Sequence, residues 1–159
     1  MTGDGFTDSA RAIENLVVSY AQLIDGGDFE GLGALLADAA FGGDTGGTVT
    51  GAPAIAELFR SMVRVYDDGT PRTKHVTTNI RVDVDEANGT ADCASYVTVF
   101  QAVPGMALQP IVAGRYRDRF EHRAGEWRFV ERRFFTDLVG DVSRHLLVDP
   151  GVLGPRANA

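Results

Sequence analysis

Apolar residues in the first part of the chain recur every three or four positions, which is the spacing of one face of a helix. One such stripe consists of Ile13, Leu16, Val17, Tyr20, Leu23 and Ile24. It predicts a helix that begins near Asp8 or Ser9, either of which can cap it, and runs to about Asp25. Gly26 and Gly27 follow, and consecutive glycines end a helix.

Two further helices are predicted before the strands begin. Asp28 can cap a short helix over residues 29–37, in which two glycines weaken the helical propensity by about 1 kcal/mol each. Residues 41–50 are rich in glycine and threonine, which predicts a loop with a short strand at each end. Pro53 opens a third helix, which keeps its apolar spacing up to Tyr66 and then meets an Asp-Asp-Gly sequence.

From Thr70 onward the period changes from helical to alternating, which is typical of strands. Asn88 and Gly89 form a predicted hairpin turn, and residues 104–110 form a predicted apolar loop that could cover a pocket. The alternation predicts four long antiparallel strands, at residues 73–85, 90–103, 111–123 and 126–137.

Helices followed by antiparallel strands are typical of an α+β domain. We expect a cone-shaped curved antiparallel sheet packed against three N-terminal helices, which together enclose an apolar pocket. Residues 1–7 are expected to be a flexible N-terminus, residues 8–138 the domain, and residues 139–159 a tail. The tail has one predicted helical turn between Asp141 and Leu147, and it is the other candidate cover for the pocket.

Charge and composition narrow the classes of function. The chain carries a formal net charge of −7, whereas a nucleic-acid-binding protein needs a basic face, so we expect no nucleic-acid partner. Cys93 is the single cysteine, which excludes an intrachain disulfide and fits a reducing compartment. The sequence has neither a signal-peptide pattern nor an apolar run of membrane-spanning length. A cytoplasmic protein without a membrane partner is therefore expected.

Candidate chemistry starts at the end of the first helix. Tyr20 lies on the apolar face, and Asp25 shares its neighbourhood if the helix ends there. His75 and Asn79 lie in the first predicted strand, on one face if that strand is regular. A carboxylate beside a histidine fixes its tautomer and stabilises the imidazolium, so Asp25 and His75 would together form a general base. Tyr20 would donate to a substrate oxygen.

Later strands offer further candidates for substrate binding. Tyr96 and Tyr116 are two of them. Arg132 and Arg133 are adjacent, so one of them points away from the other and could enter the cavity. The pattern does not choose between these arginines, and we take Arg133 as the candidate.

Other kinds of site lack their motifs. One histidine with one nearby carboxylate supplies too few ligands for zinc. The sequence has no Gly-x-Ser-x-Gly elbow and no Gly-x-Gly-x-x-Gly after a strand. We therefore expect no metal and no cofactor. His122, in a charged turn, and His145, in the tail, are expected to be solvated.

With these residues placed, the chain resembles the SnoaL-like branch of the nuclear-transport-factor-2-like superfamily over about residues 8–138. This superfamily has a cone fold that hosts dehydratases, isomerases, cyclases, hydrolases and structural subunits. The resemblance rests on the first-helix pattern from Ile13 to Asp28, Gly-Ala-Pro-Ala-Ile at 51–55, Lys-His-Val-Thr-Thr-Asn at 74–79, Gly-Arg-Tyr at 114–116 and Trp-Arg-Phe at 127–129.

Within this superfamily, the set Tyr20, Asp25 and His75 is similar to the catalytic set of scytalone dehydratase and of bacterial bile acid 7α-dehydratases. The resemblance implies that His75 abstracts a proton, Asp25 orients it and Tyr20 assists at the oxygen. The implied activity is that of a cofactor-independent lyase or isomerase acting on a hydrophobic cyclic oxygenated small molecule. Scytalone dehydratase brings further histidines from its sheet, whereas the later strands here offer Tyr96 and Tyr116 but no identified inward histidine.

Alternatives to this activity stay open. One is a non-catalytic ligand-binding or assembly module, such as a protein like the small subunit of a ring-hydroxylating dioxygenase. Another is a polyketide cyclase, which also needs an acid and a base in an apolar cone. An epoxide hydrolase needs an Asp-Arg-Asp group around a water, and the sequence does not assemble one. A homodimer or homotrimer formed through the outer face of the sheet is expected with either class of function.

Overall fold

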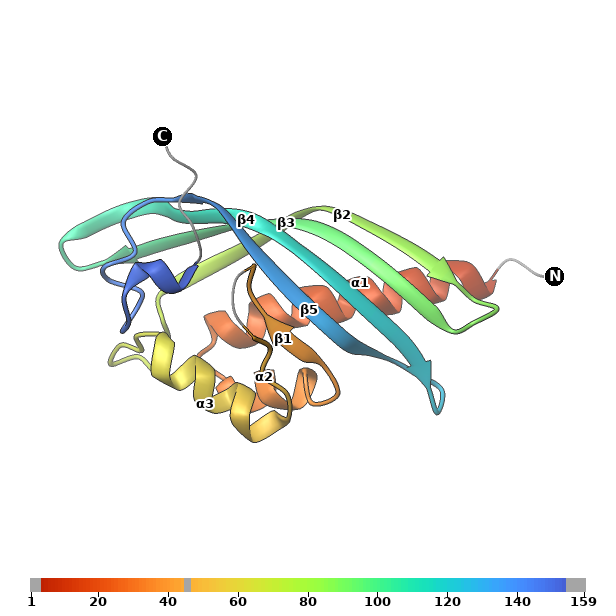
Figure 1. Cartoon of the computed structure of the whole chain (residues 1–159). Helices are drawn as coiled ribbons and strands as arrows, with labels where there is room; N and C mark the ends of the chain where they lie inside the picture. Colours follow the sequence, from red (N-terminus) through yellow and green to blue (C-terminus); the bar gives the residue numbers. More distant parts are fainter. Residues whose placement is uncertain (1–3, 45–46, 154–159) are drawn as a thin grey trace.

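Three helices cover one side of a curved, open sheet of five strands (Figure 1). The computed structural model describes residues 4–44 and 47–153. The strand order is β1-β5-β4-β3-β2, in which β1 is parallel to β5 and all other neighbours are antiparallel. The elements are α1 (Asp4–Asp25), α2 (Phe29–Leu35), β1 (Ala40–Gly42), α3 (Ala52–Met62), β2 (Thr73–Asp85), β3 (Thr90–Val103), β4 (Met106–Arg123), β5 (Glu126–Val139) and the 3-10 helix η1 (Pro150–Leu153).

The expected α+β class is confirmed, and so are the bounds predicted for β2 and β3. The predicted loop over residues 104–110 is wrong, because the chain turns tightly around Gly105 (φ 85°) and β4 begins at Met106. Most of that segment is therefore strand. The short strand β1, which pairs with β5, begins the segment expected to be a loop with short strands at its ends.

The helix ends differ from the predicted ones for local reasons. α1 begins at Asp4, earlier than the expected start. α3 ends at Met62 rather than at Tyr66, because Val63 leaves the helix and forms a β-bridge with Leu146. Residues 1–3 of the expected flexible N-terminus and residues 154–159 of the expected tail lie outside the described residues.

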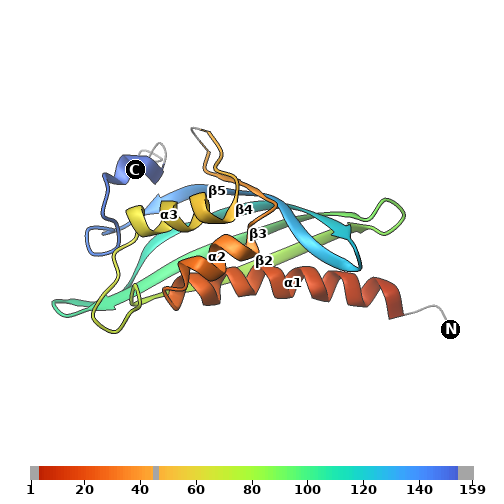
Figure 2. The same ribbon diagram turned by 90° about the horizontal axis from the view of Figure 1, so that it is seen from below.

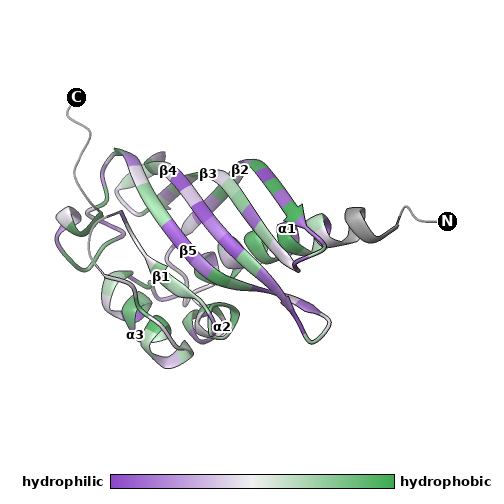
Figure 3. Ribbon diagram, turned by 45° about the vertical axis from the view of Figure 1, so that its right-hand side comes forward, coloured by the Kyte–Doolittle hydropathy of each residue, from purple (hydrophilic) through white to green (hydrophobic). Residues whose placement is uncertain are grey.

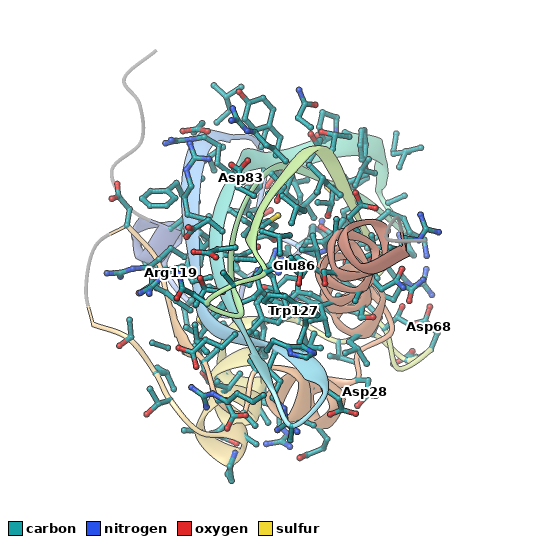
Figure 4. The ribbon with its side chains drawn as sticks, turned by 90° about the vertical axis from the view of Figure 1, so that its right-hand side faces the viewer. Asp28, Asp68, Asp83, Glu86, Arg119 and Trp127 are labelled. Atoms are coloured by element: carbon teal, nitrogen blue, oxygen red, sulfur yellow. The ribbon has the colours of Figure 1, made fainter. Side chains whose placement is uncertain are left out.

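The core fills the space between the helices and the inner face of the sheet. Seen from below, the three helices lie in front of the strands (Figure 2), and the strands alternate between apolar and polar positions (Figure 3). In the end-on view of Figure 4, Asp83 lies on the outer side of the sheet and Trp127 lies next to α1. Fully buried side chains from every layer meet here, including Ile13, Val17, Leu32, Leu36, Ile55 and Ile111.

A bulge in β2 changes which residues face the core. The register with β3 shifts between Thr78 and Arg81, and Asn79 has a φ of 53°, which is unusual for a residue other than glycine. After the bulge, partly buried apolar residues such as Ile80 pack on the core. Before it, His75 faces inward, and Val76 is 42% exposed. The bulge therefore lets one strand turn both His75 and Ile80 towards the core, although they are an odd number of residues apart.

A second register shift acts in the same way on β5. Phe120 of β4 pairs with Phe129, but the preceding Arg119 pairs with Glu131, so Val130 is an extra residue. Phe129 and Arg132 are both buried as a result. This second bulge decides which of the two adjacent arginines enters the core.

Gly27 lets the end of α1 lie directly on the turn that leads into β2. It has a φ of 71°, and a Cβ atom at this position would lie 2.2 Å from the carbonyl oxygen of Gly69. Only glycine fits both the backbone conformation and the close approach. The contact places the end of α1 beside the beginning of β2, where the candidate site lies.

We predict that Gly27→Ala destabilises the protein by about 3 kcal/mol or more, because a steric clash adds to the strain of a left-handed residue. Gly69→Ala is the matched control: Gly69 also has a positive φ, of 81°, but its Cβ would meet nothing within 4 Å. It should cost only about 1 kcal/mol. Urea unfolding of both variants measures the difference, and equal losses would contradict the close-approach argument.

Candidate functional site

The carboxylate of Asp25 and the imidazole of His75 form a nearly buried pair. Asp25 Oδ1 lies 2.6 Å from His75 Nδ1, and the two side chains are 10% and 6% exposed. The backbone N–H of His75 donates to Asp25 Oδ2 at 2.8 Å, and the hydroxyl of Thr73 donates to Oδ1 at 2.9 Å. Three donors from β2 thus converge on one carboxylate at the end of α1.

These hydrogen bonds decide the charge of Asp25. Burial alone would raise the pKa of Asp25, but the hydrogen bonds from His75 and Thr73 and the attraction of His75 outweigh it and hold the pKa below its usual value. Asp25 is therefore a carboxylate at neutral pH and accepts the Nδ1 proton of His75. That tautomer leaves Nε2 of a neutral His75 as an acceptor, which is the state a general base needs.

His75 borders a small cavity of about 100 Å³. The cavity is smaller than an engineered core cavity of about 150 Å³ that holds benzene, so in this form it suits at most one small ring. It has an apolar wall with a few polar groups, as small-molecule sites usually do. The lining residues are His75, Val97, Val99, Val112, Gly114, Tyr116, Phe134, Phe135, Thr136, His145 and Leu153.

Tyr116 is the inward-facing phenol of this cavity, and Tyr20 packs behind it. The rings of Tyr20 and Tyr116 meet edge to face, 5.7 Å between centroids, and Tyr20 is not among the residues that line the cavity. Burial, followed by the neighbouring Tyr116, raises the pKa of Tyr20 well above its usual value. Burial also raises the pKa of Tyr116, against the opposing effect of Arg132. Both phenols are therefore neutral donors.

Arg132 lies fully buried between these two rings. Its guanidinium carbon is 4.0 Å from the ring centroid of Tyr20 and 3.8 Å from that of Tyr116, a cation–π arrangement. Arg132 Nε lies 3.6 Å from Asp118 Oδ1, too far for a hydrogen bond. Burial raises the pKa of Asp118 to about 6 in spite of the Arg132 charge. Such under-bonded buried charges are rare in cores and often accompany functional sites.

The remaining predicted site residues lie elsewhere. Asn79 is exposed at the β2 bulge, so the expected regular strand, with Asn79 on the face of His75, is wrong. Tyr96 is 53% exposed on the outer face of the sheet. Arg133 is the partly exposed member of the arginine pair and donates through Nη1 to the carbonyl oxygen of Gly43 at 3.2 Å. The second bulge turns Arg132 inward instead, so the choice of Arg133 for the cavity is wrong.

His145 is a cavity residue that the sequence reasoning missed. It was expected to be solvated, yet it is 7% exposed and lines the cavity together with His75. Burial and the neighbouring His75 lower the pKa of His145 to about 4, although Asp25 opposes the shift. The available signal was the apolar flank of the tail, since Val142 and Leu146 are also buried.

Comparisons with known proteins agree with the observed fold. Residues 7–133 match the SnoaL-like domain. No curated protein matches the chain. A "putative scytalone dehydratase" from Novosphingobium aromaticivorans is 22% identical with a TM-score of 0.72, over 100% of this chain and 99% of that one. A Mycobacterium tuberculosis protein of unknown function is 25% identical with a TM-score of 0.70, over 94% of this chain and 85% of that one.

LinA is similar in the same way, at 22% identity and a TM-score of 0.68, over 91% of this chain and 96% of LinA. These likenesses establish the fold. Within residues 4–44 and 47–153, no helix has the length and apolar character needed to cross a membrane. Nor does this part of the chain gather three or more histidine, cysteine or acidic side chains into a group that could hold a metal ion.

We predict that His75→Phe raises the pKa of Asp25. Phenylalanine keeps an aromatic ring over the carboxylate but removes the side-chain hydrogen bond and the electrostatic attraction of His75. Thr73→Val, which removes one weaker bond, should produce a smaller rise. Carbon NMR of the Asp25 carboxyl group during a pH titration measures both shifts. An unchanged Asp25 titration in His75→Phe would show that the pair does not act as described.

We predict that His145 weakens the fold as the pH falls. Its pKa is about 4 in the folded chain and ordinarily 6.5, so the unfolded chain binds more protons between these values, and stability is lost as the pH falls through them. The loss amounts to about 3 kcal/mol. Urea unfolding at neutral pH and at about pH 4 measures this loss. The difference in unfolding free energy between the parent and His145→Gln should change by this amount between the two pH values.

The matched control for this measurement is His122→Gln, at an exposed position in the β4–β5 hairpin. It removes a histidine that does not line the cavity of His75 and His145, and so it shows what the substitution itself does to the unfolding free energy. A difference in unfolding free energy between the parent and His145→Gln that does not change with pH would contradict the burial of a neutral His145.

Proposed function

Because this chain belongs to the SnoaL-like domain family, we propose that it is a cofactor-independent lyase or isomerase that removes a proton from a small hydrophobic cyclic oxygenated molecule. The observation that carries the proposal is the contact of 2.6 Å between Asp25 and His75 at the wall of an apolar cavity. A proton transfer needs a base, an orienting group and a donor for the substrate oxygen, and this chain supplies all three.

In the proposed reaction, Nε2 of His75 takes a proton from the carbon next to a substrate carbonyl. Asp25 holds the ring in the required tautomer and stabilises the imidazolium that forms. The electron pair of the broken C–H bond becomes a carbon–carbon double bond, and the carbonyl oxygen gains negative charge. When the pair is used to expel a β-hydroxyl group, that group takes the proton from His75 and leaves as water.

Tyr116 is the proposed donor to the carbonyl oxygen, because it is the phenol in the cavity wall. The cation of Arg132, 3.8 Å from its ring centroid, favours the negative charge that develops at this end of the substrate. Tyr20, which the resemblance implied as the donor, is assigned here to the layer behind Tyr116. In that position it supports the ring of Tyr116 and the charge of Arg132.

Dehydration and isomerisation share this first step, and they differ only in where the proton goes next. A polyketide cyclase would also begin with it. A binding or assembly module needs no base at the wall of a cavity, whereas here the imidazole that Asp25 orients lines one. The dyad thus favours an enzyme over a module of that kind.

We further propose that the molecule works as a homo-oligomer in the cytoplasm.

Turnover of simple β-hydroxy ketones tests the proposal. We predict that the parent exchanges the hydrogens next to the carbonyl of β-hydroxycyclohexanone and of its ring-methylated analogues in deuterated water, and converts these ketones to the unsaturated products. Proton NMR follows the exchange, and ultraviolet absorbance follows the elimination. His75→Gln should lower both rates by about a hundredfold or more, since it removes the general base.

Asp25→Asn should lower the rates in the same direction, because an amide at this position disturbs the tautomer of His75. Lys74→Gln changes an exposed neighbour in the same strand and is the control. Equal rates in the parent, His75→Gln and Lys74→Gln, or no exchange above background with any of these ketones, would overturn the proposal.

A further inference from the structure

His145 lies in the wall of the same cavity as His75, although it comes from the C-terminal segment. Its side chain is buried, and its Nδ1 atom has no hydrogen-bond partner among the described residues. A buried polar atom left without a partner costs about 1–3 kcal/mol. The other groups of the cavity wall are mostly apolar, so a leucine at this position would fill the space without that cost.

The backbone holds His145 firmly in this place. Its N–H donates to the carbonyl oxygen of Val142 at 3.0 Å, and its carbonyl oxygen accepts from the N–H of Arg64 at 2.8 Å. Gln101 Nε2 donates to the carbonyl oxygen of the preceding Arg144 at 3.1 Å. The segment is therefore tied to β3 and to the chain that follows α3. An imidazole presented by so many backbone contacts is a fixed feature of the cavity.

His145 also remains neutral at neutral pH. Burial and the proximity of His75 both oppose a charge on it, and only Asp25 favours one. A neutral imidazole has one donor and one acceptor nitrogen. It can therefore hold a substrate hydroxyl without competing for the proton that His75 removes.

We propose that His145 is a substrate-binding residue that hydrogen-bonds the hydroxyl group of a small cyclic alcohol in this cavity. The assignment rests on the proposed function, in which that hydroxyl group takes the proton from His75 and departs as water. The two oxygens of the substrate are thus divided. Tyr116, beside the Arg132 cation, binds the oxygen that becomes negative, and His145, beside His75, binds the oxygen that becomes water.

The size of the cavity narrows the substrate class. About 100 Å³ suits a single six-membered ring with an oxygen substituent rather than a fused ring system. Leu153 of η1 borders the cavity, so the same segment that carries His145 also limits the length of the ring substituents.

Cyclohexanol and methylcyclohexane are the probes for this site, because they share size and shape and differ in the hydroxyl group. With nitrogen-labelled histidine, cyclohexanol should shift the ring nitrogen signals of His145 in the parent, and methylcyclohexane should not. His145→Leu should weaken cyclohexanol binding about tenfold, the value of one hydrogen bond, and leave methylcyclohexane binding unchanged. His122→Leu, at an exposed position, should change neither.

These measurements need no turnover, so they separate this inference from the proposed function. A shift at His145 without any catalysed exchange would support the hydroxyl-binding role of His145 and contradict the proposed enzymatic activity. Catalysed exchange with no shift at His145, or with equal cyclohexanol affinity in the parent and His145→Leu, would overturn the role of His145 alone. Failure of cyclohexanol to bind the parent would overturn it as well. The signal shift in the parent decides the question even if His145→Leu does not fold.

Discussion

The carboxylate of Asp25 is the interaction on which the geometry of this molecule depends. It joins the end of α1 to the beginning of β2, which is an edge strand, through the Thr73 hydroxyl and the backbone and ring of His75. A buried carboxylate is unfavourable unless several donors satisfy it. Gly27 allows the helix end to lie against the turn before β2, which brings the carboxylate close to these donors. One hydrogen-bonded carboxylate thus fastens the edge strand to α1 and orients the candidate base.

Two bulges decide which polar side chains reach the interior. In a regular strand, His75 would lie on the face opposite to Ile80, and Arg132 would lie opposite to Phe129. The extra residues at the β2 bulge and at Val130 reverse the alternation between the members of each pair. Apolar residues and the polar residues His75 and Arg132 then share one face. Bulges are enriched near active sites because they re-aim a side chain without interrupting the strand.

The predictable part of this structure is the part that periodicity describes. Apolar spacing gave the helices and the strands because their burial follows directly from it, and the Asp25–His75 hypothesis followed from one helix end and one strand start. Alternation could not place Asn79 or choose Arg132 over Arg133, because a bulge changes the phase without changing the composition of the strand. His145 was missed because its burial depends on the bridge between Val63 and Leu146, a contact between distant segments, and locally only the apolar flank of the tail indicated it.

The charges around the cavity suit a neutral substrate. Arg132 is enclosed by the rings of Tyr20 and Tyr116 and by Asp118, and it does not line the cavity. It therefore does not contact a substrate in the cavity directly, and it acts on one only through its electric field. In the proposed reaction such a cation gives little to a neutral ground state and more to a transition state in which an oxygen becomes negative, which is the difference that accelerates a reaction. The net charge of −7 acts in the same sense, because it disfavours the approach of anions.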